Sequence, residues 1–346
     1  MTRRTALVLA AAATATVVLA LAGLALGPVR VPLADTVRVL TGLTPSDPRW
    51  QAIVWSLRLP RVLTALAAGA ALGVAGLQLQ TLFRNTLADP YILGVSSGAG
   101  LGVALVVLVG GAAGGGFTAA LAGAGRTLHV VAAASGAAAM LALVMLASRW
   151  ARSAATLLLI GVMLGAAGTA LVSVCLVYGD PQRVQQYLLW GLGSFTATSW
   201  ADLALLVPLV AVGLVAAVAT IRPLNALLLG ENYAATMGID VRRAKLITVI
   251  SASLLAGVIT AFCGPVAFVG LVVPHLARIA VGTSDHRAVL PAVMLLGPVA
   301  ALSCGIISQL PGSDIVIPIN AVTALVGAPV VIAVLLRGER GSGLTS

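Results

Sequence analysis

Side chains that could carry out catalysis are scarce in this sequence, and none is arranged to do so. The three histidines, His129, His275 and His286, form neither the HExxH pattern of a zinc enzyme nor a Ser/His/Asp group. The single lysine, Lys245, follows two arginines and an alanine, whereas a P-loop lysine follows a glycine loop that holds phosphates. We therefore expect no catalytic residue and no ATP site on this chain, and structural roles for its histidines.

The acidic residues argue against a carrier driven by protons or sodium. All ten lie in loops, in tails or at the ends of apolar runs. Ion-coupled carriers generally hold a carboxylate at membrane depth, at a cost of about 2.5–3.5 kcal/mol. An ion-coupled secondary transporter stays open as an alternative, because backbone carbonyls can also coordinate sodium.

The cysteines do not suggest a metal site. Cys175, Cys263 and Cys304 lie far apart in apolar runs, without the spacing of metal ligands. We expect them to be ordinary packing residues, and we expect neither a bound metal nor another cofactor on this chain.

The composition places the chain in a membrane. Apolar residues make up 60% of the 346 and charged residues only 9%, with a mean hydropathy of +1.09. A soluble domain carries about 25% charged residues. The net charge of +10 comes from basic residues in short loops between apolar runs, so the lipid bilayer accounts for it and no nucleic-acid partner is expected.

Ten apolar segments are long enough to cross a bilayer core of about 30 Å, which predicts an all-α polytopic membrane protein. The first exceeds 20 residues, so it is expected to be an uncleaved span, because the apolar core of a signal peptide has about 7–15 residues. The third is rich in glycine and the eighth carries Pro274, so both need neighbouring helices to satisfy their backbone. The segments are 5–27, 61–83, 93–111, 127–148, 154–178, 201–221, 246–264, 267–281, 291–310 and 318–336.

The basic residues predict the orientation of these spans. Ten crossings place both termini on one side of the membrane. If that side is the inside, the inner loops and tails hold 13 arginines and lysines and the outer loops hold 7. Positive residues favour the inner face, so we expect both termini in the cytoplasm.

Small residues recur at one spacing in two of the predicted spans, and such residues allow helices to approach closely. The match suggests a five-helix repeat, 1–200 and 201–346, inside a single transmembrane domain spanning 1–346. Chance in a chain rich in alanine and glycine is the alternative. The two sets are Gly69, Gly73 and Gly76 with Gln80 at the next position, and Ser253, Gly257, Thr260 and Gly264. Gln80 is then expected to point into the bundle and not at lipid.

Longer motifs give the sequence a family resemblance that runs in order along nearly the whole chain. It resembles the FecCD-type permeases, the membrane subunits of ABC importers for iron-siderophores, haem and cobalamin. The motifs are Arg58-Leu59-Pro60-Arg61, Gly69-Ala70-Ala71-Leu72-Gly73, the stretches 84–90 and 93–99, Trp190-Gly191-Leu192-Gly193-Ser194, Leu229-Gly230-Glu231 with Met237-Gly238-Ile239, the stretch 264–275, Asp285-His286-Arg287 and Val326-Gly327-Ala328-Pro329.

The resemblance implies an ABC importer type II-like permease without enzymatic activity of its own. Two permease subunits would enclose the pathway, a cytoplasmic ATPase dimer would bind ATP-Mg, and an extracytoplasmic binding protein would deliver the substrate. Such a permease moves an iron-siderophore or a related metal chelate across the cytoplasmic membrane by alternating access.

Two basic residues are candidates for docking the binding protein. Arg58 and Arg61 lie on the predicted outer side, just before the second span. The resemblance implies that they pair with glutamates of the binding protein, a charge-assisted contact that sets orientation. Anchoring to lipid headgroups is the alternative.

The longest predicted inner loop, 222–245, is the candidate for coupling to the ATPase. Residues 223–229 and 231–237 are expected to form two short helices, with Gly230 at the break and Gly238 as a left-handed end. A solvated loop is the alternative, although it would expose apolar residues without purpose. The coupling candidates are Leu229, Gly230, Glu231, Ala234, Ala235, Met237 and Gly238.

Two stretches, 84–98 and 264–275, hold proline, glycine, asparagine and serine at membrane depth or at its inner edge. Irregular backbone is tolerated there when it faces protein or a water-filled cavity. We expect both stretches to line or shape the gate, and helix packing alone is the alternative. The gate candidates are Gln80, Asn85, Leu87, Pro90, Gly94, Ser96, Ser97, Gly98, Gly264, Pro265, Phe268, Gly270, Pro274 and His275.

The sequence departs from the family pattern near its end. An arginine of the family's docking set is missing, so either Arg58 and Arg61 dock alone or a heterodimer partner supplies the rest, which is the alternative that we favour. Thr86 also stands where the family usually has proline. Cys304, Ser308 or Gln309, Val316 and Asn320 occupy the positions of the family's Asp-x-x-x-Arg and Glu-x-Pro-x-Gly patterns, of which Pro318 alone is kept.

Overall fold

A computed structural model describes residues 2–106, 115–148, 150, 153–309 and 316–342, and every regular element among them is helical. Residues 107–111 of the third predicted span and residue 310 of the ninth lie outside the described residues. The apolar helices are α1 (Arg3–Ala25), α4 (Leu59–Leu82), α5 (Val95–Ala104), α6 (Gly115–Ser148), α7 (Ala154–Tyr178), α9 (Trp200–Ala219), α12 (Val241–Cys263), α13 (Val269–Val281), α14 (His286–Ser308) and α15 (Ile319–Ser342).

These helices match the ten predicted segments one for one. Among the described residues, seven are long and apolar enough to cross a membrane, and three are shorter apolar helices: α5, α13 and residues 319–333 of α15. α5 has 10 residues and α13 has 13. At 1.5 Å per residue the described lengths of α5 and α13 are about 15 and 20 Å, which is shorter than a core of about 30 Å. These are the two segments whose composition predicted a need for neighbouring helices.

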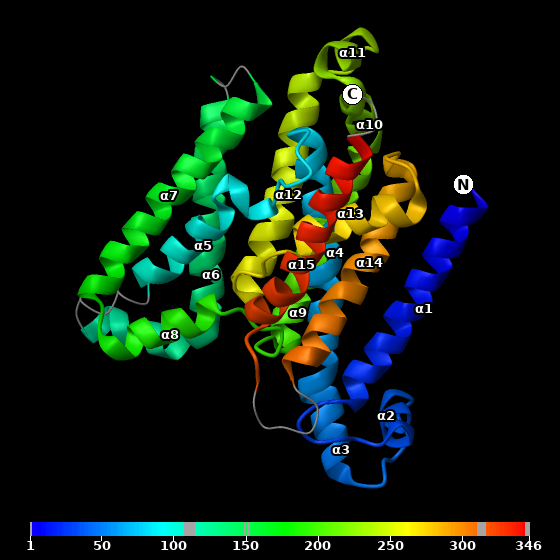
Figure 1. The fold of residues 1–346 in the computed structure, drawn as a ribbon. Coiled ribbons are helices and arrows are strands. Elements are labelled where there is room, and N and C mark those ends of the chain that lie inside the picture. The colour runs from blue at the N-terminus through cyan, green and yellow to red at the C-terminus, as the bar shows by residue number, and fades with distance from the viewer. Residues whose placement is uncertain (1, 107–114, 149, 151–152, 310–315, 343–346) are drawn as a thin grey trace.

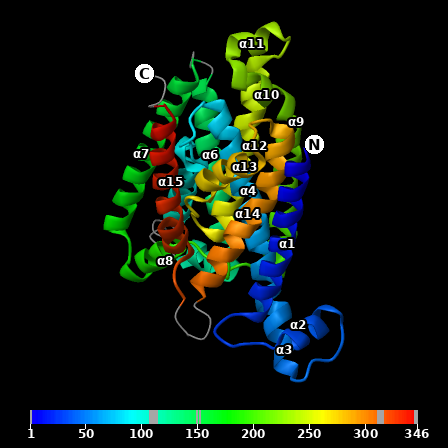
Figure 2. The same cartoon turned by 45° about the vertical axis from the view of Figure 1, so that its right-hand side comes forward.

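Shorter helices lie at the two ends of the bundle (Figures 1 and 2). α10 (Ile221–Leu229) and α11 (Glu231–Thr236) lie at the same end as the start of α1 and the last turn of α15. α2 (Leu33–Leu40), α3 (Pro48–Ala52) and α8 (Pro181–Gly191) lie at the opposite end, and the sequence analysis did not predict them. Below, the first end is called the inner end and the second the outer end, following the predicted orientation.

The acidic residues account for many of the helix starts. Asp47, Asp180, Asp240 and Asp285 are N-cap residues whose carboxylates accept a backbone N–H of the first turn of α3, α8, α12 and α14. Asp89 does the same for the 3₁₀ turn η2 (Pro90–Leu93). Such caps satisfy backbone donors that have no partner inside the helix. The carboxylates at the ends of the apolar runs therefore have a structural role as helix caps.

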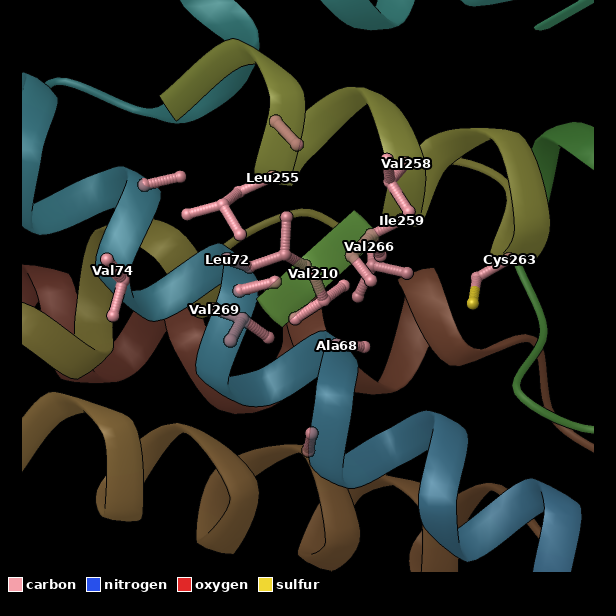
Figure 3. Close-up of a cluster of buried hydrophobic side chains, with 14 of the residues drawn as sticks. Ala68, Leu72, Val74, Val210, Leu255, Val258, Ile259, Cys263, Val266 and Val269 are labelled. Carbon is pink, nitrogen blue, oxygen red and sulfur yellow. The ribbon is translucent and has the colours of Figure 1, made fainter. Parts of the chain in front are cut away.

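α4 is the central helix and is covered on all sides. It packs against α14, α12, α13 and α9, and 20 of its 24 residues are buried. Figure 3 shows Leu72 of α4 among side chains of α12, α9 and the start of α13, including Leu255, Val210 and Val269. Gln78 and Gln80 are both buried although they point to different faces of the helix, because each face meets another helix.

The small residues of α4 are the reason its neighbours lie so close. A Cβ atom added at Gly69 would overlap the backbone of Gly297 in α14, and one added at Gly76 would overlap Gly270 in α13. The predicted small-residue face of α4 is therefore where α14 and α13 cross it closely.

This geometry predicts that Gly76→Ala lowers stability by about 1–3 kcal/mol, because its methyl group forces backbone against backbone. Thermal unfolding of the purified protein in detergent measures the effect. The matched control is Gly191→Ala at the end of α8, where an added Cβ meets nothing within 4 Å. Equal melting temperatures for the two variants would contradict this account of α4 packing.

Candidate functional site

Both candidate docking arginines are bound to the outer end of α1. Arg58, in the π-helical turn η1 (Ile53–Arg58), donates from Nη1 to the carbonyls of Leu24 and Ala25 at 2.7 Å each, and from Nη2 to Val29. Arg61 donates to the carbonyl of Gly23 at 3.0 Å. The two residues are only 4% and 8% exposed. They thus satisfy carbonyls that the last turn of a helix leaves without partners, and their docking role stays a prediction.

The predicted coupling element forms the two short helices that the sequence analysis expected. α10 ends at Leu229 and α11 begins at Glu231, and both Gly230 (φ 128°) and Gly238 (φ 79°) adopt backbone conformations that favour glycine. The pair, together with the turn to α12, has its own small core of Leu224, Ala226, Leu227 and Ala234, packed against Ile239 and Val241. We call residues 221–238 the knuckle.

The knuckle has exposed apolar side chains on its surface and buried ones in its core. Leu229 is 65% exposed and Met237 is 60% exposed, and Ala235 is exposed beside them. Ala234 is fully buried in the small core, so it supports the knuckle from within. Glu231 pairs with Lys245 at 2.7 Å, which ties α11 to the first turns of α12. Exposed apolar side chains at one end of a membrane bundle are typical of a partner contact.

The two candidate gate stretches, 84–98 and 264–275, are far apart in the chain but meet inside the bundle. The hydroxyl oxygen of Tyr91, in η2, accepts the backbone N–H of Val266 at 3.0 Å. Pro90 packs directly on Gly270, where an added Cβ would overlap its ring. The structure thus brings together the two irregular stretches that are predicted, from separate parts of the sequence, to shape the gate.

Each of these stretches contains one residue other than glycine in a left-handed backbone conformation. Arg84 (φ 49°) and Phe268 (φ 67°) are the two residues other than glycine with positive φ among those described. Left-handed backbone at such residues costs of order 1–3 kcal/mol and persists only where the surroundings hold it. Arg84 opens the first stretch, and Phe268 precedes α13 and packs against Gly327 of α15. These two turns are the places in the bundle where strain is stored.

The remaining gate candidates divide between buried packing and exposed positions. Asn85 and Leu87 are exposed, and the Asn85 carboxamide accepts the Leu87 N–H at 2.9 Å.

Gly94 packs on Gly165 of α7, and Gly98 packs on Gly136 of α6. Ser97 lies 3.3 Å from the Thr169 hydroxyl, and Ser96 is half-buried beside it in the chain. Gly264 and Pro265 pack against Gly193, Pro274 is buried within α13, and His275 is half-buried.

Gln80 joins this region to α13. Its Nε2 donates to the carbonyl of Leu271 at 3.0 Å, and its Oε1 accepts from Nη1 of Arg278 at 2.9 Å. Both ends of a buried amide are therefore satisfied across one helix interface. The side chain points into the bundle, as its position in the small-residue pattern predicted.

Comparisons with known proteins agree with this geometry. The model of the FecCD transport family matches residues 15–337. The chain belongs to the FecCD transport family. Among its relatives, the vitamin B12 import system permease protein BtuC of Klebsiella pneumoniae is 37% identical over 296 residues, which are 85% of each chain. The protein of that name from Citrobacter koseri is 35% identical over 295 residues, 84% of this chain and 85% of its own.

A solved structure supports the same fold. It is described as an inward-facing conformation of a putative metal-chelate type ABC transporter, and it superposes with a TM-score of 0.81 at 29% identity. The match covers 95% of this chain and 98% of that chain. As a FecCD member, this chain is the membrane-spanning permease of an ABC importer, and the all-α architecture expected from its sequence is confirmed.

Several of the departures from the FecCD pattern lie together at the outer end. Arg61 lines a hollow of about 150 Å³ at the outer end together with Ser308, Gln309, Val316 and Pro318. Three of these residues stand at or beside the positions where the family resemblance implied charged groups. The uncharged replacements therefore lie next to Arg61, which no carboxylate of the described residues approaches within ion-pair distance.

A larger hollow of about 1220 Å³ was missed by sequence reasoning. It lies between the inner ends of α6, α7 and α12 and has an apolar wall that includes Leu82, Met145 and Leu157. Arg242 and Arg243 stand at its rim. Its residues come from four helices far apart in the chain, so no local motif could have marked it.

The contacts of Arg58 predict that Arg58→Met lowers stability by about 1–3 kcal/mol, because buried carbonyls at the end of α1 lose their donors. Thermal unfolding in detergent measures the loss, and Arg30→Met, at an exposed position of the same end, is the control. A binding-protein pull-down with both variants separates support from docking. An unchanged melting temperature for Arg58→Met would contradict the supporting role.

Proposed function

We propose that this permease carries a metal chelate across the cytoplasmic membrane by alternating access, driven by ATP hydrolysis on separate subunits. The observation that carries the proposal is the family match over residues 15–337. The chain performs no chemistry on its substrate in this proposal. It holds two conformations of the pathway, and the ATPase cycle changes which of them is populated.

The substrate to test first is cobalamin. The relatives at 35–37% identity are vitamin B12 import permeases, and the solved neighbour is named for metal chelates. An iron-siderophore, expected from the sequence, and haem belong to the same class of large chelates. The choice among them rests with the binding protein, because the gate candidates are mostly small or apolar and, apart from Gln80, Asn85 and His275, carry few groups that could select a ligand.

Three kinds of partner follow from this proposal. A cytoplasmic ATPase dimer contacts the knuckle, whose Leu229 and Met237 are exposed. An extracytoplasmic binding protein docks at the outer end near Arg58 and Arg61. A second permease subunit completes the pathway, in a homodimer or, as we favour, a heterodimer, since the uncharged hollow beside Arg61 leaves part of the docking set to a partner.

The orientation in this proposal places the knuckle and both chain ends in the cytoplasm. The start of α1 and the last turn of α15 lie at the knuckle end of the bundle (Figure 1). The rival is an ion-coupled secondary transporter. The carboxylates that cap helices give it little support, because their oxygens already accept backbone N–H groups.

Reconstitution tests the function directly. The permease is placed in proteoliposomes with its ATPase and binding protein, and uptake of labelled cobalamin, ferric siderophore and haem is measured. We expect one of the chelates to accumulate only when ATP is present on the ATPase side. Uptake that continues without the ATPase and collapses with a protonophore would select the ion-coupled carrier instead.

The knuckle surface is tested by Met237→Glu. A charge in an apolar contact loses burial and must be desolvated, so we expect the ATPase to copurify at least about tenfold less well. Leu43→Glu is the control, because Leu43 is 63% exposed and lies at the outer end. Equal ATPase recovery with both variants would reject the knuckle as the contact.

A further inference from the structure

Several buried polar side chains gather where α10 meets the inner end of α4. α10 is the first helix of the knuckle, and α4 leads directly into the gate stretch 84–98. Polar contacts connect the two helices at three points between Gln78 and Arg84. None of these contacts follows from the docking or gate assignments.

The contacts of Gln78 and Arg84, the first and third in chain order, lie at the two ends of α10. Gln78, which is fully buried, donates from Nε2 to the hydroxyl of Thr220 at 3.2 Å, just before α10 begins. Its Oε1 accepts from the Ser251 hydroxyl of α12 at 3.2 Å. Near the other end, Arg84 donates from Nε and Nη2 to the carbonyl of Leu227 at 3.3 and 3.1 Å.

The middle contact runs through the start of α14. Asn225 of α10 donates from Nδ2 to Oδ1 of Asp285 at 2.6 Å. Its Oδ1 lies 2.8 Å from both the backbone nitrogen and Nδ1 of His286. Nε2 of His286 lies 3.0 Å from the hydroxyl of Thr81 in α4. His286 and Thr81 are 2% and 3% exposed, so water does not compete for the bond between them.

The chemistry of these groups fixes the direction of the bonds. The backbone N–H of Arg287 and the Asn225 amide hold the pKa of Asp285 below its usual range, so its carboxylate only accepts. The Asn225 amide must then turn its oxygen to His286, which places the ring proton on Nδ1. Nε2 of His286 is left as an acceptor for the Thr81 hydroxyl. The same hydroxyl also donates to the carbonyl of Leu77 at 2.9 Å.

We propose that Asn225, His286 and Thr81 are positioning residues that make α10 and the inner end of α4 one mechanical unit. The inference rests on the proposed function, in which the ATPase moves the knuckle. Movement of α10 then reaches the gate stretch through α4, because Asn225 bonds to His286 and His286 bonds to Thr81. Thr81 lies three residues before the left-handed turn at Arg84 that opens the stretch. An α10 without these contacts would move while the gate stayed still.

The test uses a reporter in the gate stretch. Leu87, which is 40% exposed, is replaced by cysteine in a chain whose three native cysteines are alanine. The complex with its ATPase is placed in nanodiscs, and the rate of maleimide labelling is measured with and without ATP and vanadate. Thr81→Val removes the hydroxyl at nearly constant volume, and Thr81→Ser keeps it. Thr248→Val is the matched control, because the fully buried Thr248 hydroxyl bonds to Ala244 of its own helix.

We expect ATP and vanadate to change the labelling rate in the reporter chain, in Thr81→Ser and in Thr248→Val. In Thr81→Val the change should shrink by about fivefold or more while ATP hydrolysis continues, because the link to His286 is broken. Asn225→Ala should cause the same loss, and the double variant should lose no more, as expected of residues that act as one unit.

Two results would overturn the inference: a full labelling response in Thr81→Val, or a reporter chain that hydrolyses ATP without any change in labelling. A failure of the proposed function is distinguishable from both. In that case, the unaltered chain would neither assemble with an ATPase nor support ATP-dependent uptake.

Discussion

The covering of α4 on every side is the constraint on which the rest of the structure depends. A helix without an exposed face must meet each neighbour with small residues, and Gly69 and Gly76 provide that contact with α14 and α13. It must also pair every polar group that it carries, since an unpaired buried amide is costly. Gln78, Gln80 and Thr81 are paired with three different elements. A helix held in this way cannot shift without moving its neighbours.

The local rules of sequence predicted much of the fold. The lengths of the apolar runs located the ten helices. The positions of Gly230 and Gly238 predicted the break and the end of the knuckle, where both glycines have positive φ. The contacts that give these elements their roles were beyond those rules. Arg58 binds carbonyls 33 and 34 residues earlier, and Thr81 meets a histidine 205 residues later. A motif marks a residue type at a position, but packing of distant segments decides its partner.

The two ends of the molecule use polar groups differently. At the outer end, Arg58 and Arg61 fasten α1 to α4, and the hollow beside Arg61 is lined by uncharged residues. At the inner end, a chain of hydrogen bonds fastens the knuckle to α4 and α14. Between them, the gate stretches 84–98 and 264–275 touch through Tyr91 and Gly270. This FecCD member thus has one continuous path of contacts from the knuckle to the two candidate gate stretches.

Pulsed electron paramagnetic resonance tests that path most directly. One spin label is placed at Asn232 of the knuckle, and the other at Leu57 of η1, just before the outer end of α4, or at Tyr178, at the outer end of α7. All three side chains are exposed. The spans are comparable with the length of α4, about 36 Å. When ATP binds, the account predicts an unchanged Asn232–Leu57 distance and an altered Asn232–Tyr178 distance. An Asn232–Leu57 distance that shifts as much as the other would contradict it.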